Sequence, residues 1–474
     1  MTLIAALILT LTPPGPPSAA AAPPCLRPSR AGTQVQGEVR VCPGRYRIPD
    51  PSERGVIVAA ASGTRIDLTG VVLESGDSVP DRFTGVGIVS KDVDGVSVLG
   101  GTVRGYRIGL RLEGGRGHRV TRTDLSRSRS AALRSTATRP DTADRLDPFR
   151  LPAFTGAGAG LVLVRTVGAS VTGVTARAAQ NGIGLVEARE SYLADNDVAG
   201  NSGWGISLWR SSRNVLVRNR VHNTQRCAPP GVDCGGAAIL LREGSDSNTV
   251  AENDLTASST GLRITGRKPL TRPSIGNLIH RNDASSCGVG FAAGHTWSVT
   301  FLENRADSAA YGFRLDHLTG SVVRGNTVIG SRVAGIAMEH GSDNTLEANV
   351  LLGGRVGIMV TAPGRDGAPS RGHRIDDNVV GGVEQGILLQ GTTGSRLRGN
   401  LLDGLEDGLV IDNAGHGTEV TGNVFLRATG WFIDAPDLAA GGNYWATADA
   451  AATSARVRGR VSVLPWRPAS AAGY

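Results

Sequence analysis

Short runs of alternating apolar and polar residues recur along most of the chain, separated by bends rich in Gly, Asn and Asp. The stretch from Gly335 to Val350 shows one such unit. It opens with Gly-Ile-Ala-Met, passes through a polar bend, and then carries Asn344 and Asn349 around a second short apolar run. Alternation with a period of two is typical of strands that bury one face. Each unit is therefore predicted to consist of short strands joined by tight bends.

The units return at a spacing of about 22 to 24 residues, which lies in the range of solenoid repeats. One unit cannot bury its apolar face alone, so neighbouring units are expected to stack as coils with parallel strands about 4.8 Å apart. Asn at the same bend of successive coils can tolerate a left-handed conformation and hydrogen-bond its neighbours in a ladder, a structural rather than a catalytic role. The units open at Gly85, Gly109, Gly160, Gly182, Gly205, Gly261, Gly288, Gly312, Gly335, Gly357, Gly386 and Gly408, with Ala238 once in place of Gly, and the recurring asparagines are Asn196, Asn219, Asn253, Asn282, Asn304, Asn326, Asn349, Asn378, Asn400 and Asn423.

The pattern resembles the right-handed parallel β-helix proteins with carbohydrate-binding and sugar-hydrolase type repeats, which include the NosD-like group and the pectate lyase-like superfamily. The likeness covers roughly residues 55 to 445 and is carried by the Gly335 unit, by Gly205 to Asn214, and by a closing Gly-Asn-Tyr-Trp at 442–445. It implies an all-β, single-stranded right-handed parallel β-helix. The superfamily includes lyases, hydrolases, epimerases and non-enzymatic proteins, so the likeness does not specify the chemistry. The predicted segments are a signal peptide at 1–22, an N-terminal cap at 23–54, a β-helix of roughly fourteen coils at 55–431, and a C-terminal cap at 432–474.

Composition agrees with many short strands, since the 474 residues include 66 glycines and only 4% aromatic residues. The apolar run from Leu3 to Leu11, followed by small residues at Ala19 to Ala22, indicates a secretory signal. No segment is long enough to span a bilayer. The protein is therefore expected to be secreted or periplasmic and monomeric.

Five cysteines fit an oxidising compartment. A disulfide between Cys25 and Cys42 would staple the N-terminal region, and one between Cys227 and Cys234 would close a short loop. Cys287 has no partner left and is interpreted as a small buried residue rather than as a reactive thiol.

The net charge of +8 is carried almost wholly by Arg. It favours acidic partners such as uronate polysaccharides, although the bias of a GC-rich genome explains it equally well. Scattered charge and an export signal argue against nucleic acid as a partner.

Aligned on their opening glycines, adjacent coils place Asp316 beside Glu339 and His317 beside His340. Two carboxylates about 5 Å apart match the separation used by retaining glycosidases. Histidines could orient them or act as bases. The catalytic hypothesis therefore comprises Asp316, Glu339, His317 and His340, with His295 one coil earlier.

Further residues of the same columns would bind the substrate, through a stacking aromatic ring or a guanidinium that holds a carboxylate. These are Trp209, Arg210, Arg242, Glu243 and Trp297. If the substrate is a uronate, β-elimination competes with hydrolysis as the reaction.

No cofactor is evident and no metal ligands are assigned, although the same acidic and His residues offer a divalent ion such as Ca²⁺ a site. The only methionines are Met1, Met338 and Met359, which does not favour a thioether copper site. The alternative to polysaccharide binding and cleavage is a non-enzymatic scaffold, or a NosD-like accessory protein in the maturation of a metal enzyme.

Overall fold

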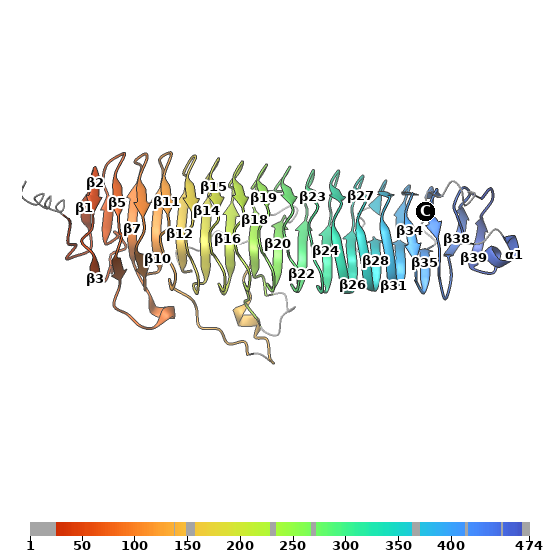
Figure 1. Ribbon diagram of the computed structural model, residues 1–474, viewed down its shortest axis with the longest axis horizontal. Coiled ribbons are helices and arrows are strands. Elements are labelled where there is room, and N and C mark those ends of the chain that lie inside the picture. The colour runs from red at the N-terminus through yellow and green to blue at the C-terminus, as the bar shows by residue number, and fades with distance from the viewer. Residues whose placement is uncertain are drawn as a thin grey trace, which may run out of the picture.

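A computed structural model of the protein describes residues 25–136, 138–147, 157–227, 234–266, 272–362, 370–412, 416–446 and 449–466. The predicted signal peptide at 1–22 lies outside these residues. The chain winds into a right-handed parallel β-helix, which confirms the predicted fold class, and Figure 1 shows its coils stacked in chain order from β1 to β39. No helix in the described segments is long and apolar enough to cross a membrane.

One long face of the β-helix carries the candidate site. Its strands pair in parallel, each with the strand of the next coil, and most are six residues long or more. The strands of this first face are β1 (Thr33–Val35), β4 (Ile57–Ala59), β7 (Val86–Lys91), β10 (Ile108–Glu113), β12 (Ala159–Val164), β14 (Asn181–Val186), β16 (Trp204–Trp209), β18 (Ala237–Arg242), β20 (Thr260–Thr265), β22 (Val289–Gly294), β24 (Tyr311–Asp316), β26 (Thr327–Glu339), β28 (Val350–Thr361), β31 (Val379–Gln390), β35 (Asp407–Ile411), β38 (Ile433–Ala439) and β39 (Val457–Ser462).

The second face is a sheet of 15 short strands, close to the roughly fourteen coils predicted. Its strands are β2 (Glu38–Arg40), β5 (Arg65–Asp67), β8 (Ser97–Leu99), β11 (Arg119–Thr121), β13 (Ser170–Thr172), β15 (Tyr192–Ala194), β17 (Val215–Val217), β19 (Thr249–Ala251), β21 (Leu278–His280), β23 (Thr300–Leu302), β25 (Val322–Arg324), β27 (Thr345–Glu347), β30 (Arg374–Asp376), β33 (Arg396–Arg398) and β36 (Glu419–Thr421).

The third side is formed by strands only near the ends of the stack. In between, single-residue parallel bridges from Thr102 to Thr327 link successive coils on this side. From Thr327 onward this side is part of the long strands β26, β28 and β31. The remaining elements are β3 (Gly44–Arg47), β6 (Val71–Glu74), β9 (Thr102–Arg104), β34 (Leu401–Asp403) and β37 (Val424–Phe425) on this side, the pair β29 (Ser370–Arg371) and β32 (Thr392–Thr393), the 3-10 turns η1 (Pro80–Arg82) and η2 (Thr142–Asp144), and the helix α1 (Ala450–Ser454).

The coils extend further than predicted at both ends. Strands β1 to β3 pair in register with β4 to β6, so residues 33–47 form a first coil rather than a separate cap. At the other end β38 pairs with β35 and then with β39, beyond residue 431. Alternation is short in both segments, which is why the sequence pattern placed them outside the repeat.

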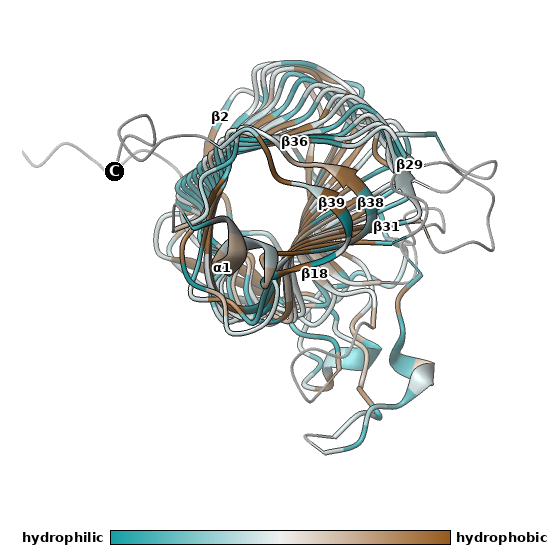
Figure 2. Cartoon of the chain, turned by 90° about the vertical axis from the view of Figure 1, so that its right-hand side faces the viewer, coloured by the Kyte–Doolittle hydropathy of each residue, from teal (hydrophilic) through white to brown (hydrophobic). Residues whose placement is uncertain are grey.

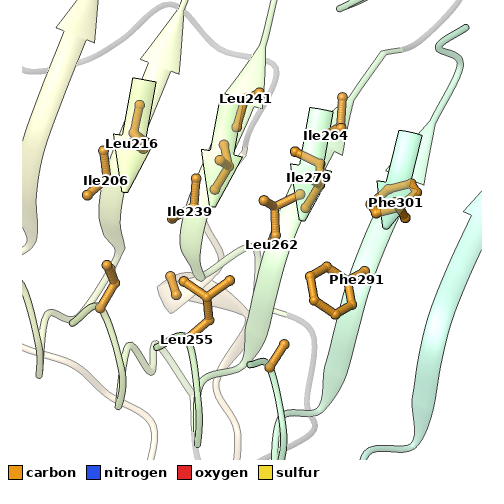
Figure 3. Close-up of a cluster of buried hydrophobic side chains, with 14 of the residues drawn as sticks. Ile206, Leu216, Ile239, Leu241, Leu255, Leu262, Ile264, Ile279, Phe291 and Phe301 are labelled. Atoms are coloured by element: carbon orange, nitrogen blue, oxygen red, sulfur yellow. The ribbon is translucent and has the colours of Figure 1, made fainter. Parts of the chain in front are cut away.

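The interior is one continuous apolar column. Ile206, Ile239, Leu262 and Phe291 occupy the same register position of four successive coils and lie in a row (Figure 3). Near the C-terminal end Trp445 is buried, and its ring stacks on Phe425 with centroids 4.7 Å apart. The chain continues beyond the Gly-Asn-Tyr-Trp segment into β39, where Val461 packs against the same core. Seen along its axis, the stack superposes coil on coil, with loops projecting from the side (Figure 2).

The predicted asparagine ladder is present. Each asparagine lies buried inside its bend and donates from its side-chain amide to the Oδ1 atom of the next one, as Asn304 does to Asn326 at 3.0 Å. The ladder asparagines do not adopt the left-handed conformation that Asn tolerates. It belongs to the residue before each of them, such as Glu303 with φ 54° before Asn304. The preceding residue turns the chain, because the Asn side chain must point inward to reach the ladder.

The opening glycines lie where two coils approach closely. A Cβ on Gly312 would lie 2.6 Å from the carbonyl oxygen of Gly335 in the next coil, closer than real Cβ atoms come. The same geometry identifies Gly290, rather than Gly288, as the opening glycine of its coil, since β20 pairs with β22 through Thr260 and Val289. The alignment of that coil therefore shifts by two residues.

Both predicted disulfides are present, Cys25–Cys42 and Cys227–Cys234, and Cys287 is a buried free thiol. Burial raises the pKa of Cys287 to about 12, which agrees with an unreactive core residue.

Candidate functional site

The predicted acidic pair lies on adjacent coils of the first face. Asp316 is the last residue of β24, Glu339 is the last residue of β26, and the two are register partners. Their backbones are therefore about 4.8 Å apart. Both side chains are partly exposed on the outer surface of the sheet and line the same groove. The adjacency inferred from the sequence is thus present in the structure, whereas its catalytic role is untested.

Three histidines follow these strands and stack on one another. His295, His317 and His340 each take the first position after a strand of the first face, with φ values of 50°, 53° and 50°. The rings of His295 and His317 are stacked with centroids 4.1 Å apart, and those of His317 and His340 are tilted with centroids 4.8 Å apart. The left-handed bend directs all three side chains to the same side of the stack.

The corrected register explains why His295 belongs to this row. Aligned on Gly288, it fell in the bend of the preceding coil. With Gly290 as the opening residue, Gly294 pairs with Asp316, and His295 then occupies the same position as His317. The loop length before β22 differs from that of its neighbours, so counting along the sequence missed this match.

Asp316 and His317 are joined directly. Nδ1 of His317 lies 2.6 Å from Oδ1 of Asp316, and a carboxylate can only accept in such a bond. The Asp316 side chain is 43% exposed and that of His317 24%. The bond leaves Nε2 of His317 directed elsewhere and holds the carboxylate in one orientation.

A groove of about 350 Å³ runs over the outer surface of β20, β22 and β24 beside the acidic pair. Its floor is made of small residues, among them Ala292 and Gly294, which leave room above the sheet. Arg263, Arg314 and His295 also line the groove. Neither arginine had been identified from the sequence, because they occupy the second outward position of their strands rather than the fourth.

The predicted aromatic and basic binding residues lie elsewhere. Trp209 is 6% exposed, and the guanidinium of Arg210 covers its ring at 4.2 Å. Arg242 is 1% exposed and packs over Trp204 at 4.4 Å, and burial lowers its pKa to about 10. An open sugar platform at Trp209 and a surface carboxylate ligand at Arg242 are therefore both wrong as predicted.

The physical reason is the loop before β12. Arg226 donates to the carbonyl oxygen of Asp144 at 2.7 Å, and the backbone N–H of Leu146 donates to Cys234. Leu146 then packs on the apolar outer surface of β16 and β18. Periodicity indicates which side chains point outward, but not which of them an insertion from another coil covers.

The other two binding residues predicted are also displaced from the groove. Glu243 is 9% exposed and pairs with Arg210 at 3.6 Å. Trp297 is half-buried at the bend after His295 and forms a bridge with Thr319, outside the groove lining.

The site also has the composition of a metal centre. Ligand atoms of His295, Asp316 and His317 all lie within 4.8 Å of one another. Imidazole nitrogen and carboxylate oxygen suit divalent transition metals such as copper and zinc.

A second, larger groove of about 570 Å³ lies near the N-terminal end. Arg47 and Arg104 line it and both bond to Glu74, and these charges lower the pKa of Glu74 against the opposing effect of burial. It contains no histidine and no stacked acidic pair, so it offers less chemistry than the Asp316 groove.

Residues 62–283 and 270–455 match the NosD family, described as periplasmic copper-binding protein. No curated protein sequence shows significant similarity to the chain. Among solved structures, it is similar to the Dettilon tailspike protein at 14% identity and a TM-score of 0.44, with 78% of this chain and 61% of the tailspike covered. This chain therefore spans less than two thirds of that protein's length.

Two further structures show a comparable likeness. The A-module of the Azotobacter vinelandii mannuronan C-5 epimerase AlgE6 is 14% identical with a TM-score of 0.39, and the match covers 82% of this chain and 91% of the module. A family 28 exopolygalacturonase of Yersinia enterocolitica is 11% identical with a TM-score of 0.39, covering 84% of this chain and 74% of the enzyme.

Proposed function

The chain belongs to the NosD family of periplasmic proteins, and we propose that it is an exported β-helix protein that binds polysaccharide along the outer surface of β20 to β26 and cleaves it. The observation that carries this proposal is the register pair Asp316 and Glu339 on the wall of the groove. Their backbones are about 4.8 Å apart, close to the separation of about 5 Å between the carboxyl groups of a retaining glycosidase, in which one residue attacks the anomeric carbon and the other protonates the leaving oxygen.

The hydrogen bond from His317 supports different roles for the two carboxyl groups. The bond to Nδ1 of His317 orients the Asp316 carboxylate, which suits it as the nucleophile. Glu339 then donates a proton to the glycosidic oxygen and afterwards accepts one from the water that releases the sugar from Asp316. If the bound sugar is a uronate, removal of its C5 proton is the competing reaction.

The test is a polysaccharide panel followed by reducing-end formation and by the absorbance of unsaturated uronates. Glu339→Gln and Asp316→Asn are each expected to lower the rate by about a hundredfold or more while glycan binding persists. Glu347→Gln is the matched control, because Glu347 pairs with Arg324 on the second face. Unchanged activity in both site variants would overturn the assignment, and absence of glycan binding would overturn the function itself.

Copper binding is a second candidate, favoured by the family description and by the cluster of His295, Asp316 and His317. The donor set fits Cu²⁺ better than Cu⁺, because it lacks thiolate and thioether ligands. These residues would hold the ion at a partly exposed position, from which an accessory protein of metal-enzyme maturation could pass it on. Calcium fits less well, since it takes six to eight oxygen ligands and the cluster offers few.

Calorimetric titration of metal-free protein with Cu²⁺, Zn²⁺ and Ca²⁺ tests this candidate. One Cu²⁺ per chain is expected, with nitrogen hyperfine structure in the electron paramagnetic resonance spectrum. Binding should weaken strongly in His295→Ala and His317→Ala, and not in His222→Ala, whose ring bonds to Asn223 at another bend. Equal binding by all three variants would exclude this cluster as the copper site.

A further inference from the structure

Two arginines occupy one row along the groove. Arg263 of β20 pairs in register with Ala292 of β22, which pairs with Arg314 of β24. The arginines are therefore two coils apart, about 10 Å, and only a methyl group stands between them on the sheet. Both line the groove.

Each guanidinium is held by the residue three positions earlier on its own strand. Arg263 donates to the hydroxyl of Thr260 at 2.9 Å, and the guanidinium of Arg314 lies 5.7 Å from the ring centre of Tyr311. Thr260, Val289 and Tyr311 form the next row of the same sheet. The two side chains thus lean in the same direction along their strands. The two guanidinium groups therefore lie in equivalent positions within one row along the groove.

The groove separates its charges into two rows. The arginines lie in one, and Asp316 and Glu339 lie two residues further along the strands, about 7 Å away. Although Arg314 and Asp316 share a strand, no ion pair joins them among the described residues. A ligand lying along the β-helix axis would therefore meet cations on one edge and carboxyl groups on the other.

From this arrangement we infer that the groove recognises acidic polysaccharides that carry a carboxylate on at least every second sugar, facing the same side. The inference rests on the proposed polysaccharide binding and specifies its substrate class. Successive sugars of an extended β-linked chain turn to opposite sides, so carboxylates on every second sugar face the same way, at a repeat close to the spacing of two coils. Arg263 and Arg314 would each hold one carboxylate by paired hydrogen bonds. The glycosidic bonds between them would lie toward the acidic row.

The spacing makes a prediction that simple charge attraction does not. A polymer with uronate on alternate sugars already supplies a carboxylate to each arginine. A uronate homopolymer has twice the charge, but its additional carboxylates face away from the sheet. Site-specific binding therefore predicts similar affinities for the two polymers, whereas nonspecific attraction would follow their charge density.

The experiment measures binding of the full-length protein to three glycans of equal length. These are an alternating uronate polymer, the same polymer with its carboxyl groups reduced to alcohols, and a uronate homopolymer. The alternating polymer should bind about as tightly as the homopolymer, and its reduced form at least about tenfold more weakly, since two charge-assisted pairs are lost.

Arg263→Gln and Arg314→Gln should each weaken binding of the alternating polymer about tenfold and leave the reduced polymer unaffected. Arg324→Gln, on the second face, is the control and should behave as the unmodified protein. Circular dichroism of each variant verifies the fold. Equal binding of the native and reduced polymers would overturn the inference. An affinity for the homopolymer that rises with its doubled charge density would overturn it too. Either result would leave polysaccharide binding intact. If none of the three glycans binds, the proposed function fails as well.

Discussion

Replacing Asn326 by Ala should destabilise the β-helix at one coil more than at any other. Asn326 is fully buried, and its Oδ1 atom accepts from the backbone N–H of Asn304 at 2.8 Å and from its side-chain amide at 3.0 Å. Its own amide donates to the carbonyl oxygens of Phe301 at 3.1 Å and Arg324 at 3.0 Å, and to Oδ1 of Asn349 at 3.0 Å. Alanine removes all of these side-chain bonds and supplies no substitute.

The expected cost follows from the buried polar groups that these bonds satisfy. Each buried polar group that loses its partner costs about 1–3 kcal/mol, and partial access of water lowers the sum, so the free energy of unfolding should fall by about 3–5 kcal/mol. In a solenoid each coil contacts only its neighbours, so the effect should remain local. Local opening of the coils around residues 300–350 should become at least about a hundredfold more frequent.

Hydrogen exchange read by mass spectrometry measures this directly, together with urea unfolding followed by circular dichroism. Peptides near residue 326 should exchange faster, and those near residue 200 should not change. Gln390→Ala is the matched control, because it removes an exposed amide at the end of β31. If Asn326→Ala is no more destabilising than this control, or if all coils lose protection equally, the ladder does not stabilise the stack as argued.

Two further predictions concern the core. Burial lowers the pKa of His373 to about 4, below its unfolded value of about 6.5. The stability that the neutral imidazole contributes is thus complete above pH 6.5 and declines as the pH falls toward 4, by about 3 kcal/mol in total. The difference in urea midpoint between the unmodified protein and His373→Gln should narrow over this range, and a constant difference would contradict the argument. Phe313→Ala should cost about 3–5 kcal/mol, because its fully buried ring stacks on Phe291 at 4.9 Å; Phe313→Leu should recover most of it, and equal loss in both variants would implicate the stacking geometry rather than the cavity.

The periodic part of the molecule could be predicted because it is determined locally. Each coil has a short apolar run that it cannot bury alone, and stacking equivalent coils on one another buries it. The asparagine column and the adjacency of Asp316 and Glu339 followed from counting residues between equivalent bends, and both disulfides followed from the positions of the cysteines. Counting failed at two coils, since Gly290 rather than Gly288 opens the coil of β22, and Gly87 rather than Gly85 lies beside Gly109.

The surface could not be predicted in the same way. Trp209 and Arg242 have the alternation of outward residues, yet they are 6% and 1% exposed, and Leu146 of the loop anchored by Arg226 packs on the outer surface of the same strands. Tyr311 and the two arginines of the groove were not identified from the sequence, because nothing in their own strands shows that they lie exposed beside one another.

By itself, then, the sequence determined the coil, its period and the pairs of residues that adjacent coils bring together, since those depend on backbone spacing alone. The tertiary structure decided which outward residues are reached by solvent and which are covered, and it separated the charges of the groove into two rows. That difference has a physical reason: a repeat specifies its neighbours one coil away, whereas the cover over a strand comes from a loop many coils distant in sequence, whose docking depends on individual contacts such as that between Arg226 and Asp144.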